Sequence, residues 1–219
     1  IEDYRNSKDQ DDENDITFFS YCGGIPKVKN PFCYKFSWSP LGVLKALKSP
    51  SRSIKDFKEF DAQRPWDAIS TYTAPLPVPE EFEVYPNRDS LPFIHQYRLN
   101  ENWKIKEFVR GTLRPKGWKN AWSEIFSEIE KLSVENGDKR LVEISDKLWL
   151  ENAYDESEVD RVVLVVSLKA SNGEKTKWHK TYVLDAHGDS ASTAMARLVS
   201  LPVSFAVEAV AQNKIAPGV

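Results

Sequence analysis

The sequence has 219 residues, of which 41% are hydrophobic and 12% aromatic, and this excludes a chain that is disordered over most of its length. Basic and acidic residues nearly balance, with 30 Lys and Arg against 33 Asp and Glu, so we expect no nucleic-acid partner. There is no signal-peptide pattern and no apolar run approaching the roughly 18 residues that cross a bilayer. We therefore expect a cytoplasmic protein without a membrane partner.

The cysteine, histidine and glycine content argues against several kinds of site. Cys22 and Cys33 form no CxxC pair, and the three histidines are scattered, so we expect neither a metal site nor a disulfide framework. The glycine-rich nucleotide loops, GxSxG and HExxH are all missing from the sequence. No catalytic centre is therefore evident from local motifs.

The first fifteen residues differ from the rest in charge. They contain seven acids and two bases, and they show no apolar periodicity. We expect residues 1–15 to form a flexible acidic arm or insertion. Residues 16–219 carry 28 bases and 26 acids, and we expect them to form one domain.

Hydrophobic periodicity predicts alternating strands and helices. In chain order, the patterns predict a strand at 16–21, a strand or extended loop at 32–38, a helix at 40–50, loops with short strands at 51–81, a strand end at 83–85, a short helix at 90–97, a strand at 104–114, helices at 115–129 and 138–153, a hairpin at 162–184, and a helix from 188 to 210 that is kinked or split at Pro202. The longest strands are joined by a short turn. We therefore expect an α+β fold with a mixed, largely antiparallel sheet and helices packed on one face.

Three polar clusters stand at the ends of predicted elements. Trp38 and Ser39 precede a helix, where an indole face and free backbone N–H groups suit a ligand or cofactor edge. The alternative is an aromatic strand followed by an ordinary N-cap. Arg88 lies between a turn and a predicted cap, so its planar fork can pair with a carboxylate of a ligand or of a surface acid.

The third cluster lies near the end of the predicted strand 104–114. Gly111 suggests a close backbone approach, and Thr112 and Arg114 share one strand face because they are two residues apart. Alone, this cluster also fits solvated basic residues at a strand end. Together, Arg88 and Arg114 predict a pocket for a ligand with more than one carboxylate. Cys22 is either an activated thiol or a buried strand-end cysteine.

These motifs, in this order, resemble the saccharopine dehydrogenase (saccharopine reductase) family. The resemblance spans nearly the whole chain from Thr17 onward. The motifs that carry it are Ser20 to Pro26 (SYCGGIP), Asn30-Pro31, Tyr34 to Ser39 (YKFSWS) with Gly42 to Leu44, Tyr85 to Ser90 (YPNRDS), Arg110 to Arg114 (RGTLR), and Thr193 to Val199 with Leu201-Pro202.

The resemblance implies the second, substrate-binding and dimerisation domain of an NAD- or NADP-dependent enzyme of lysine metabolism. The cofactor is then held mainly by a Rossmann domain that this chain lacks, and the chain alone is inactive and carries no catalytic acid or base. The residues implied in saccharopine binding are Arg88, Thr112, Leu113 and Arg114. Trp38 and Ser39 are implied at the cofactor edge, and Cys22 in the same cleft.

Two alternatives stay open. The acidic arm and a region at 131–160 that is shorter than in the fungal enzymes leave room for a carboxynorspermidine-type dehydrogenase, which acts on another amino-acid adduct. The chain is otherwise a non-catalytic dimerisation module whose exposed sheet pairs with a partner. All three interpretations predict a homodimer. The saccharopine dehydrogenase and the carboxynorspermidine-type dehydrogenase also predict an amino-acid ligand rich in carboxylates.

Overall fold

The computed structural model describes residues 1–132 and 137–215. The helices are α1 (Glu2–Arg5), α2 (Pro40–Lys48), α3 (Pro92–Gln96), α4 (Trp118–Ala121), α5 (Ser123–Glu130), α6 (Gly137–Asn152) and α7 (Ala194–Ala211), with a 3-10 turn η1 (Pro65–Ala68). The strands are β1 (Asp15–Pro26), β2 (Ser51–Lys55), β3 (Lys58–Ala62), β4 (Ser70–Ala74), β5 (Glu80–Pro86), β6 (Lys104–Pro115), β7 (Asp160–Asn172) and β8 (Lys175–His187).

All eight strands belong to one sheet, whose main path runs in the order β3-β2-β6-β1-β7-β8. Among the strands of the described residues, β1 and β6 are the one pair that runs parallel, and the other neighbours are antiparallel. The outer edge of β6 is shared, because β2 pairs with its first half at Phe108 and β5 with its second half from Gly111 to Pro115. The predicted α+β fold with a mixed, largely antiparallel sheet is confirmed.

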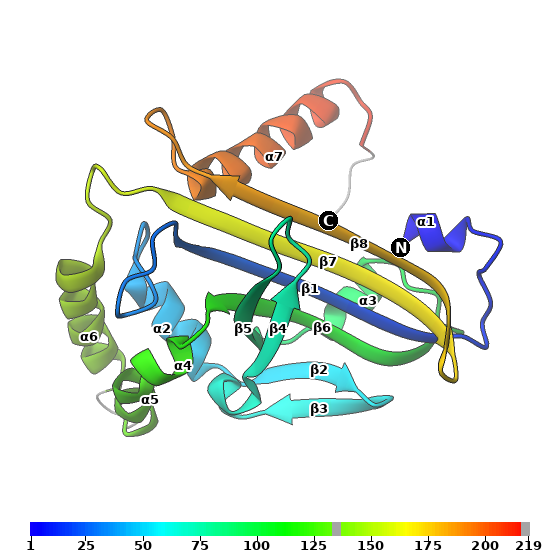
Figure 1. The fold of residues 1–219 in the computed structure, drawn as a ribbon, viewed down its shortest axis with the longest axis horizontal. Helices are drawn as coiled ribbons and strands as arrows, with labels where there is room; N and C mark the ends of the chain where they lie inside the picture. Colours follow the sequence, from blue (N-terminus) through cyan, green and yellow to red (C-terminus); the bar gives the residue numbers. More distant parts are fainter. Residues whose placement is uncertain (133–136, 216–219) are drawn as a thin grey trace.

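The two faces of the sheet are covered differently. The β4–β5 hairpin folds over one face, where Tyr72 packs on Phe19 and Tyr21. Figure 1 shows this hairpin in front of the sheet and α3 behind it. Helical segments contact the opposite face, which carries Phe18 and Phe108. We call this the helix side of the sheet.

The sequence patterns located most elements and missed some. Residues 51–81, predicted as loops with short strands, contain β2, β3, η1, β4 and the start of β5. Of the two alternatives for residues 32–38 the structure has the loop, with one isolated bridge from Phe36 to Ala153. The last helix begins at Ala194 and not at Gly188, because the Asp189 carboxylate accepts hydrogen bonds from the backbone of Ala191 and Ser192 and makes a turn there. It is not split at Pro202.

The first fifteen residues are not a free arm. Tyr4 in α1 is fully buried against Trp103 and Trp178, with ring centroids 5.0 and 5.3 Å away. The buried Asn14 amide donates to the Tyr4 hydroxyl, and Lys180 donates to Asp3. The buried Tyr4 thus holds an acidic segment whose composition alone suggested a mobile arm. The first strand of the sheet begins within this segment, at Asp15.

Helix α7 leaves most of its surface uncovered. It lies beside β7 and β8 with only its first turn against the sheet (Figure 1), and Val199 and Phe205 are 68% and 64% exposed. Its 18 residues have a mean hydropathy of 1.5, so by length and composition it is able to cross a bilayer. This differs from our expectation, because Arg197 and Glu208 interrupt the apolar run without lowering its mean hydropathy below that of a span.

Candidate functional site

Three of the predicted site residues, Cys22, Thr112 and Arg114, lie where β1 and β6 run side by side on the helix side of the sheet. Side chains alternate along a strand, so Ser20 and Cys22 of β1 face the same way as Arg110 and Thr112 of β6. The register pairs Ser20 with Arg110 and Cys22 with Thr112. Phe18 and Phe108 are buried in the aromatic cluster around Tyr4, whereas Ser20 and Arg110 are half-buried and Cys22 is exposed. We call the stretch from Ser20 and Arg110 to Cys22 and Thr112 the open face.

Arg114 ends the row on β6 and is almost completely buried, with 6% of its surface exposed. Its guanidinium carbon lies 4.6 Å from the ring centroid of Tyr34 and 5.5 Å from that of Trp118. The Nη1 atom donates to the carbonyl of Leu113 at 3.2 Å, whereas the buried Nε has no hydrogen-bond acceptor. Within residues 1–132 and 137–215, no carboxylate forms an ion pair with Arg114. A buried cation of this kind is costly unless an anion joins it.

Two further buried donors have no acceptor among the described residues, and one of them belongs to Trp118, which packs on Arg114. They are the indole Nε1 of Trp118 and the hydroxyl of Tyr154. Tyr154 is tied to the same region through its backbone N–H, which donates to the carbonyl of Phe36 at 3.3 Å. Burial, and then the negative charge of Asp160, raise the pKa of the Tyr154 hydroxyl, so it stays protonated. This end of the sheet therefore has a surplus of donors, as a site for an anion does.

Arg110 extends the positive charge along the open face, and Arg88 lies exposed in the bend beside it. The backbone N–H of Asn87, next to Arg88, donates to the carbonyl of Arg110 at 2.9 Å. The Arg110 guanidinium lies 3.6 Å from the ring centroid of Phe93 in α3. Arg110 and Arg114 are four residues apart on one strand, which places their Cα atoms about 13 Å apart.

These arginines differ from most others in the molecule. The chain has ten arginines, and six of them form ion pairs with carboxylates: Arg5, Arg52, Arg64, Arg140, Arg161 and Arg197. In the part of the chain that the structure describes, three of the other four, Arg88, Arg110 and Arg114, lie around the open face. Arg110 belongs to the RGTLR motif but is not among the residues that the sequence analysis implied in substrate binding. Its spacing of two residues from Thr112 places both side chains on one face and was the signal that could have found it.

The residues beside Arg114 on β1 and β6 differ in burial and in the face to which their side chains point. Thr112 is buried on the open face, where it lies opposite Tyr85 in the β5–β6 register. Cys22 lies opposite Thr112 and is exposed, so it is not a buried strand-end cysteine. Partial desolvation still raises the pKa of its thiol and Arg114 only partly offsets this, so the thiol is not an activated nucleophile either. The prediction for Leu113 needs correction, because its side chain points to the other face and is fully buried there. Only its backbone can line the site.

Trp38 and Ser39 lie on a different part of the helix side. The Trp38 ring is 49% exposed and its edge packs over Gly42, where a Cβ would be 2.3 Å from the ring. Ser39 precedes α2 without a side-chain cap, so the first N–H groups of that helix are not capped by its hydroxyl. The adjacent Ser37 lies 3.6 Å from the sulfur of Met195, which also fills the space over Gly24.

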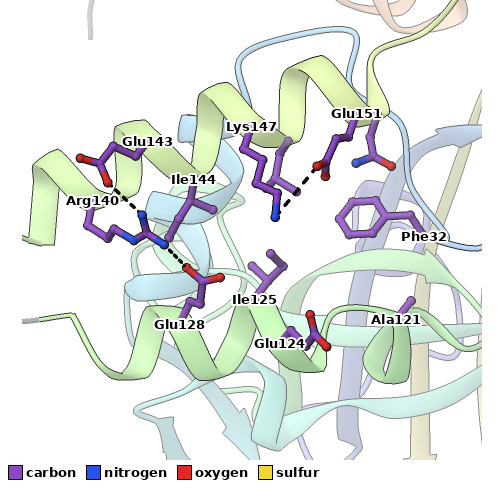
Figure 2. A pocket seen from close by; sticks show the side chains of 12 residues that line it. Phe32, Ala121, Glu124, Ile125, Glu128, Arg140, Glu143, Ile144, Lys147 and Glu151 are labelled. Carbon is purple, nitrogen blue, oxygen red and sulfur yellow. Dashed lines mark hydrogen bonds and ion pairs between the residues drawn. The ribbon is translucent and has the colours of Figure 1, made fainter.

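A groove between α5 and α6 is the alternative place for a ligand, and its chemistry is less suitable. Its volume is about 350 Å³. Figure 2 shows that both of its cations are already matched, Arg140 with Glu128 and Glu143, and Lys147 with Glu151. Glu124 adds a further negative charge at the rim. This groove therefore offers no spare cation to a carboxylate ligand, unlike the open face.

Comparisons with known proteins agree on one family. The family model described as the saccharopine dehydrogenase C-terminal domain matches residues 2–219. The saccharopine dehydrogenase (NADP+, L-glutamate-forming) of Pyricularia oryzae is 42% identical over 106 residues, which is 47% of this chain and 23% of that protein. The alpha-aminoadipic semialdehyde synthase of Arabidopsis thaliana is 34% identical over 121 residues, 53% of this chain and 11% of that protein.

A solved structure shows the same fold. The apo histidine-tagged saccharopine dehydrogenase (L-Glu forming) from Saccharomyces cerevisiae superposes with a TM-score of 0.70 at 22% sequence identity, covering 93% of this chain and 60% of that one. The matched segments thus span about a quarter or less of the curated relatives. The arrangement of strands and helices described above is one that a known enzyme contains.

Proposed function

This chain belongs to the family of saccharopine dehydrogenase C-terminal domains, and on that premise we propose that it is the substrate-binding domain of an NADP- or NAD-linked oxidoreductase of lysine metabolism. The substrate is saccharopine, and the reaction is reversible hydride transfer at the carbon of its secondary amine. Oxidation gives an imine, which water splits into aminoadipate semialdehyde and glutamate; reduction runs the other way.

The single observation that carries this proposal is the set of unpaired arginines on the open face. Saccharopine has three carboxylates, and Arg88, Arg110 and Arg114 supply three guanidinium groups that form no ion pair with a carboxylate of the described chain. The spacing of about 13 Å between Arg110 and Arg114 along β6 suits an elongated ligand with charged groups at both ends. Charge-assisted bidentate pairs would fix its orientation as well as its position.

The fit to a nicotinamide cofactor is partial. The exposed Trp38 ring offers a stacking face, and the N-terminus of α2 beyond Ser39 is free of a side-chain cap. The cofactor, when bound, supplies the hydride acceptor. No glycine-rich phosphate loop occurs in the sequence, so we place the main cofactor contacts in another domain of the whole protein. The residues of this chain then bind and orient the substrate, and we assign no catalytic acid or base to them.

A homodimer in the cytoplasm is part of the same proposal. The dimer is supported by the edge strand β8, which is 13 residues long and carries the exposed Tyr182, Val183 and Leu184. Long uncovered edges of this kind favour pairing with another chain. Light scattering after gel filtration measures the mass of the protein in solution, and a monomer at high concentration would contradict the dimer.

The deciding experiment is a steady-state assay of the full-length protein with saccharopine and NADP or NAD. We expect cofactor reduction that saturates with saccharopine. No rate with saccharopine and a good rate with a carboxynorspermidine-type adduct would favour the alternative dehydrogenase. No rate with either, in a well-folded dimer, would favour a non-catalytic module.

A further inference from the structure

Arg114 is held by aromatic rings where a carboxylate would be expected. Tyr34 is the nearest ring, at 4.6 Å from the guanidinium carbon, and Trp118 and Tyr85 follow at 5.5 and 6.0 Å. All three aromatic residues are buried, with 5% or less of their surface exposed. A ring face attracts a cation without neutralising it, and it occupies none of the N–H donors.

The acid nearest in the sheet is occupied elsewhere. Glu83 lies directly opposite Arg114 in the β5–β6 register, so the two side chains share a face. The Glu83 carboxylate instead accepts hydrogen bonds from the backbone of Gly117 at 3.0 Å and Lys119 at 2.7 Å. It thus satisfies the start of α4. The obvious internal counter-ion is unavailable, and Arg114 keeps its charge and its free Nε.

We propose that Tyr34 is a positioning residue that holds the Arg114 guanidinium, unpaired and oriented, as the receptor for one carboxylate of the substrate. The proposal rests on the proposed function and adds a residue to it. Tyr34 acts through Arg114 and not by touching the reacting atoms. The ring holds the guanidinium plane in place before the substrate arrives. Arg114 therefore loses less conformational entropy when the substrate binds.

The test compares three variants in the full-length protein. Tyr34→Leu removes the ring and keeps an apolar side chain, whereas Tyr34→Phe keeps the ring and removes only the hydroxyl. Phe126→Leu is the matched control: Phe126 lies in the same buried cluster and packs on Trp118 at 5.2 Å, but it does not face Arg114. Each variant is measured for KM and kcat with saccharopine, for the Kd of glutarate by calorimetry, and for its melting temperature.

We expect Tyr34→Leu to raise KM for saccharopine by up to about tenfold, with kcat changed less than about threefold, because immobilising a free arginine side chain on binding costs roughly that factor. Glutarate should bind correspondingly more weakly. Tyr34→Phe should restore KM to within about threefold of the native protein. Phe126→Leu should lower the melting temperature as Tyr34→Leu does, yet leave KM near its native value.

An unchanged KM in Tyr34→Leu, or an equal rise in Phe126→Leu, would overturn the proposal while leaving the saccharopine activity intact. If the native protein does not turn over saccharopine but binds glutarate, and Tyr34→Leu weakens that binding, the role of Tyr34 stands and the substrate assignment fails. If the native protein neither turns over saccharopine nor binds glutarate, both are overturned.

Discussion

The buried carboxylate of Asp160 and the backbone of Met195 are joined across 35 residues of sequence. Asp160, at the start of β7, accepts hydrogen bonds from the backbone N–H of Met195 at 2.8 Å and of Ala194 at 2.7 Å. It is 1% exposed. The acid therefore caps α7 from a neighbouring element and holds Met195 against Gly24 and Ser37, beside the predicted cofactor edge.

Removing this cap should loosen α7. We expect Asp160→Ala to lower the free energy of unfolding by about 1–2 kcal/mol, because two N–H donors at the helix start lose their acceptor. Asp160→Asn should cost less, since one amide oxygen remains. Urea unfolding measures the loss, and hydrogen exchange at Ala194 and Met195 locates it. Thr193→Ala, which removes an exposed cap to Ala196, is the control; it should leave the exchange of Met195 unchanged.

Replacing Arg114 should separate stability from binding. Arg114→Leu removes a buried cation that has no carboxylate partner in the described structure, so we expect the unfolding free energy of the ligand-free protein to stay level or rise. The same variant should lose the charge-assisted pair with substrate, about 1.5–3 kcal/mol, or roughly 10- to 150-fold in kcat/KM. Chemical denaturation and steady-state kinetics give the two quantities. A parallel fall in both would mean that Arg114 is structural.

Arg88 has a natural control in Arg98. Both adopt left-handed backbone angles, with φ of 55° and 54°, and neither forms an ion pair within the described residues. Only Arg88 lies beside the open face, through its neighbour Asn87. We expect Arg88→Ala to lower kcat/KM for saccharopine about tenfold or more, and Arg98→Ala to leave it within about twofold. Equal effects of the two substitutions would remove Arg88 from the site.

The adjacent glycines of β1 should respond differently to alanine. A Cβ at Gly23 would lie 2.2 Å from the backbone carbonyl oxygen of Leu113, which cannot move without breaking the sheet. A Cβ at Gly24 would lie 2.2 Å from the Met195 sulfur, at the end of a flexible side chain. We expect Gly23→Ala to destabilise the fold by about 2 kcal/mol or more and Gly24→Ala by less. Met195→Ala should offset the Gly24→Ala loss but not the Gly23→Ala loss, as thermal unfolding of the double variants will show.

The ion pair between Arg161 and Asp185 should make stability depend on acid pH. Hydrogen bonds from Arg161 hold the pKa of the Asp185 carboxyl below its ordinary value of 3.8. A carboxyl whose pKa is depressed in the folded state stabilises the fold above its unfolded pKa, and this contribution is lost as the pH falls through the folded pKa. We expect Asp185→Asn to be less stable than the native protein at pH 6 and to show a shallower loss of stability below about pH 4. Denaturation curves across that range would contradict this if the two proteins lost stability in parallel.

Much of the site was visible in the sequence because it depends on local spacing. Thr112 and Arg114 are two residues apart on a strand, so their shared face follows from the period of side-chain alternation. Arg88 stood out through its turn context, and the left-handed angle found there agrees with a turn. The same alternation places the Leu113 side chain on the opposite face. The resemblance had implied all three residues in substrate binding without regard to the face on which each side chain lies.

The α+β class, the long strands, most helices and the motif order of the family could be predicted from the sequence, because each depends on periodicity or on residues close together in the chain. Which charges stay unpaired could not be predicted in this way. That outcome depends on the β1–β6 and β5–β6 registers, which bring Cys22 beside Thr112 and Glu83 beside Arg114 from distant parts of the chain. Only three-dimensional packing could surround Arg114 with rings and turn Glu83 toward α4, and this arrangement leaves Arg114 buried without a carboxylate partner in the described chain.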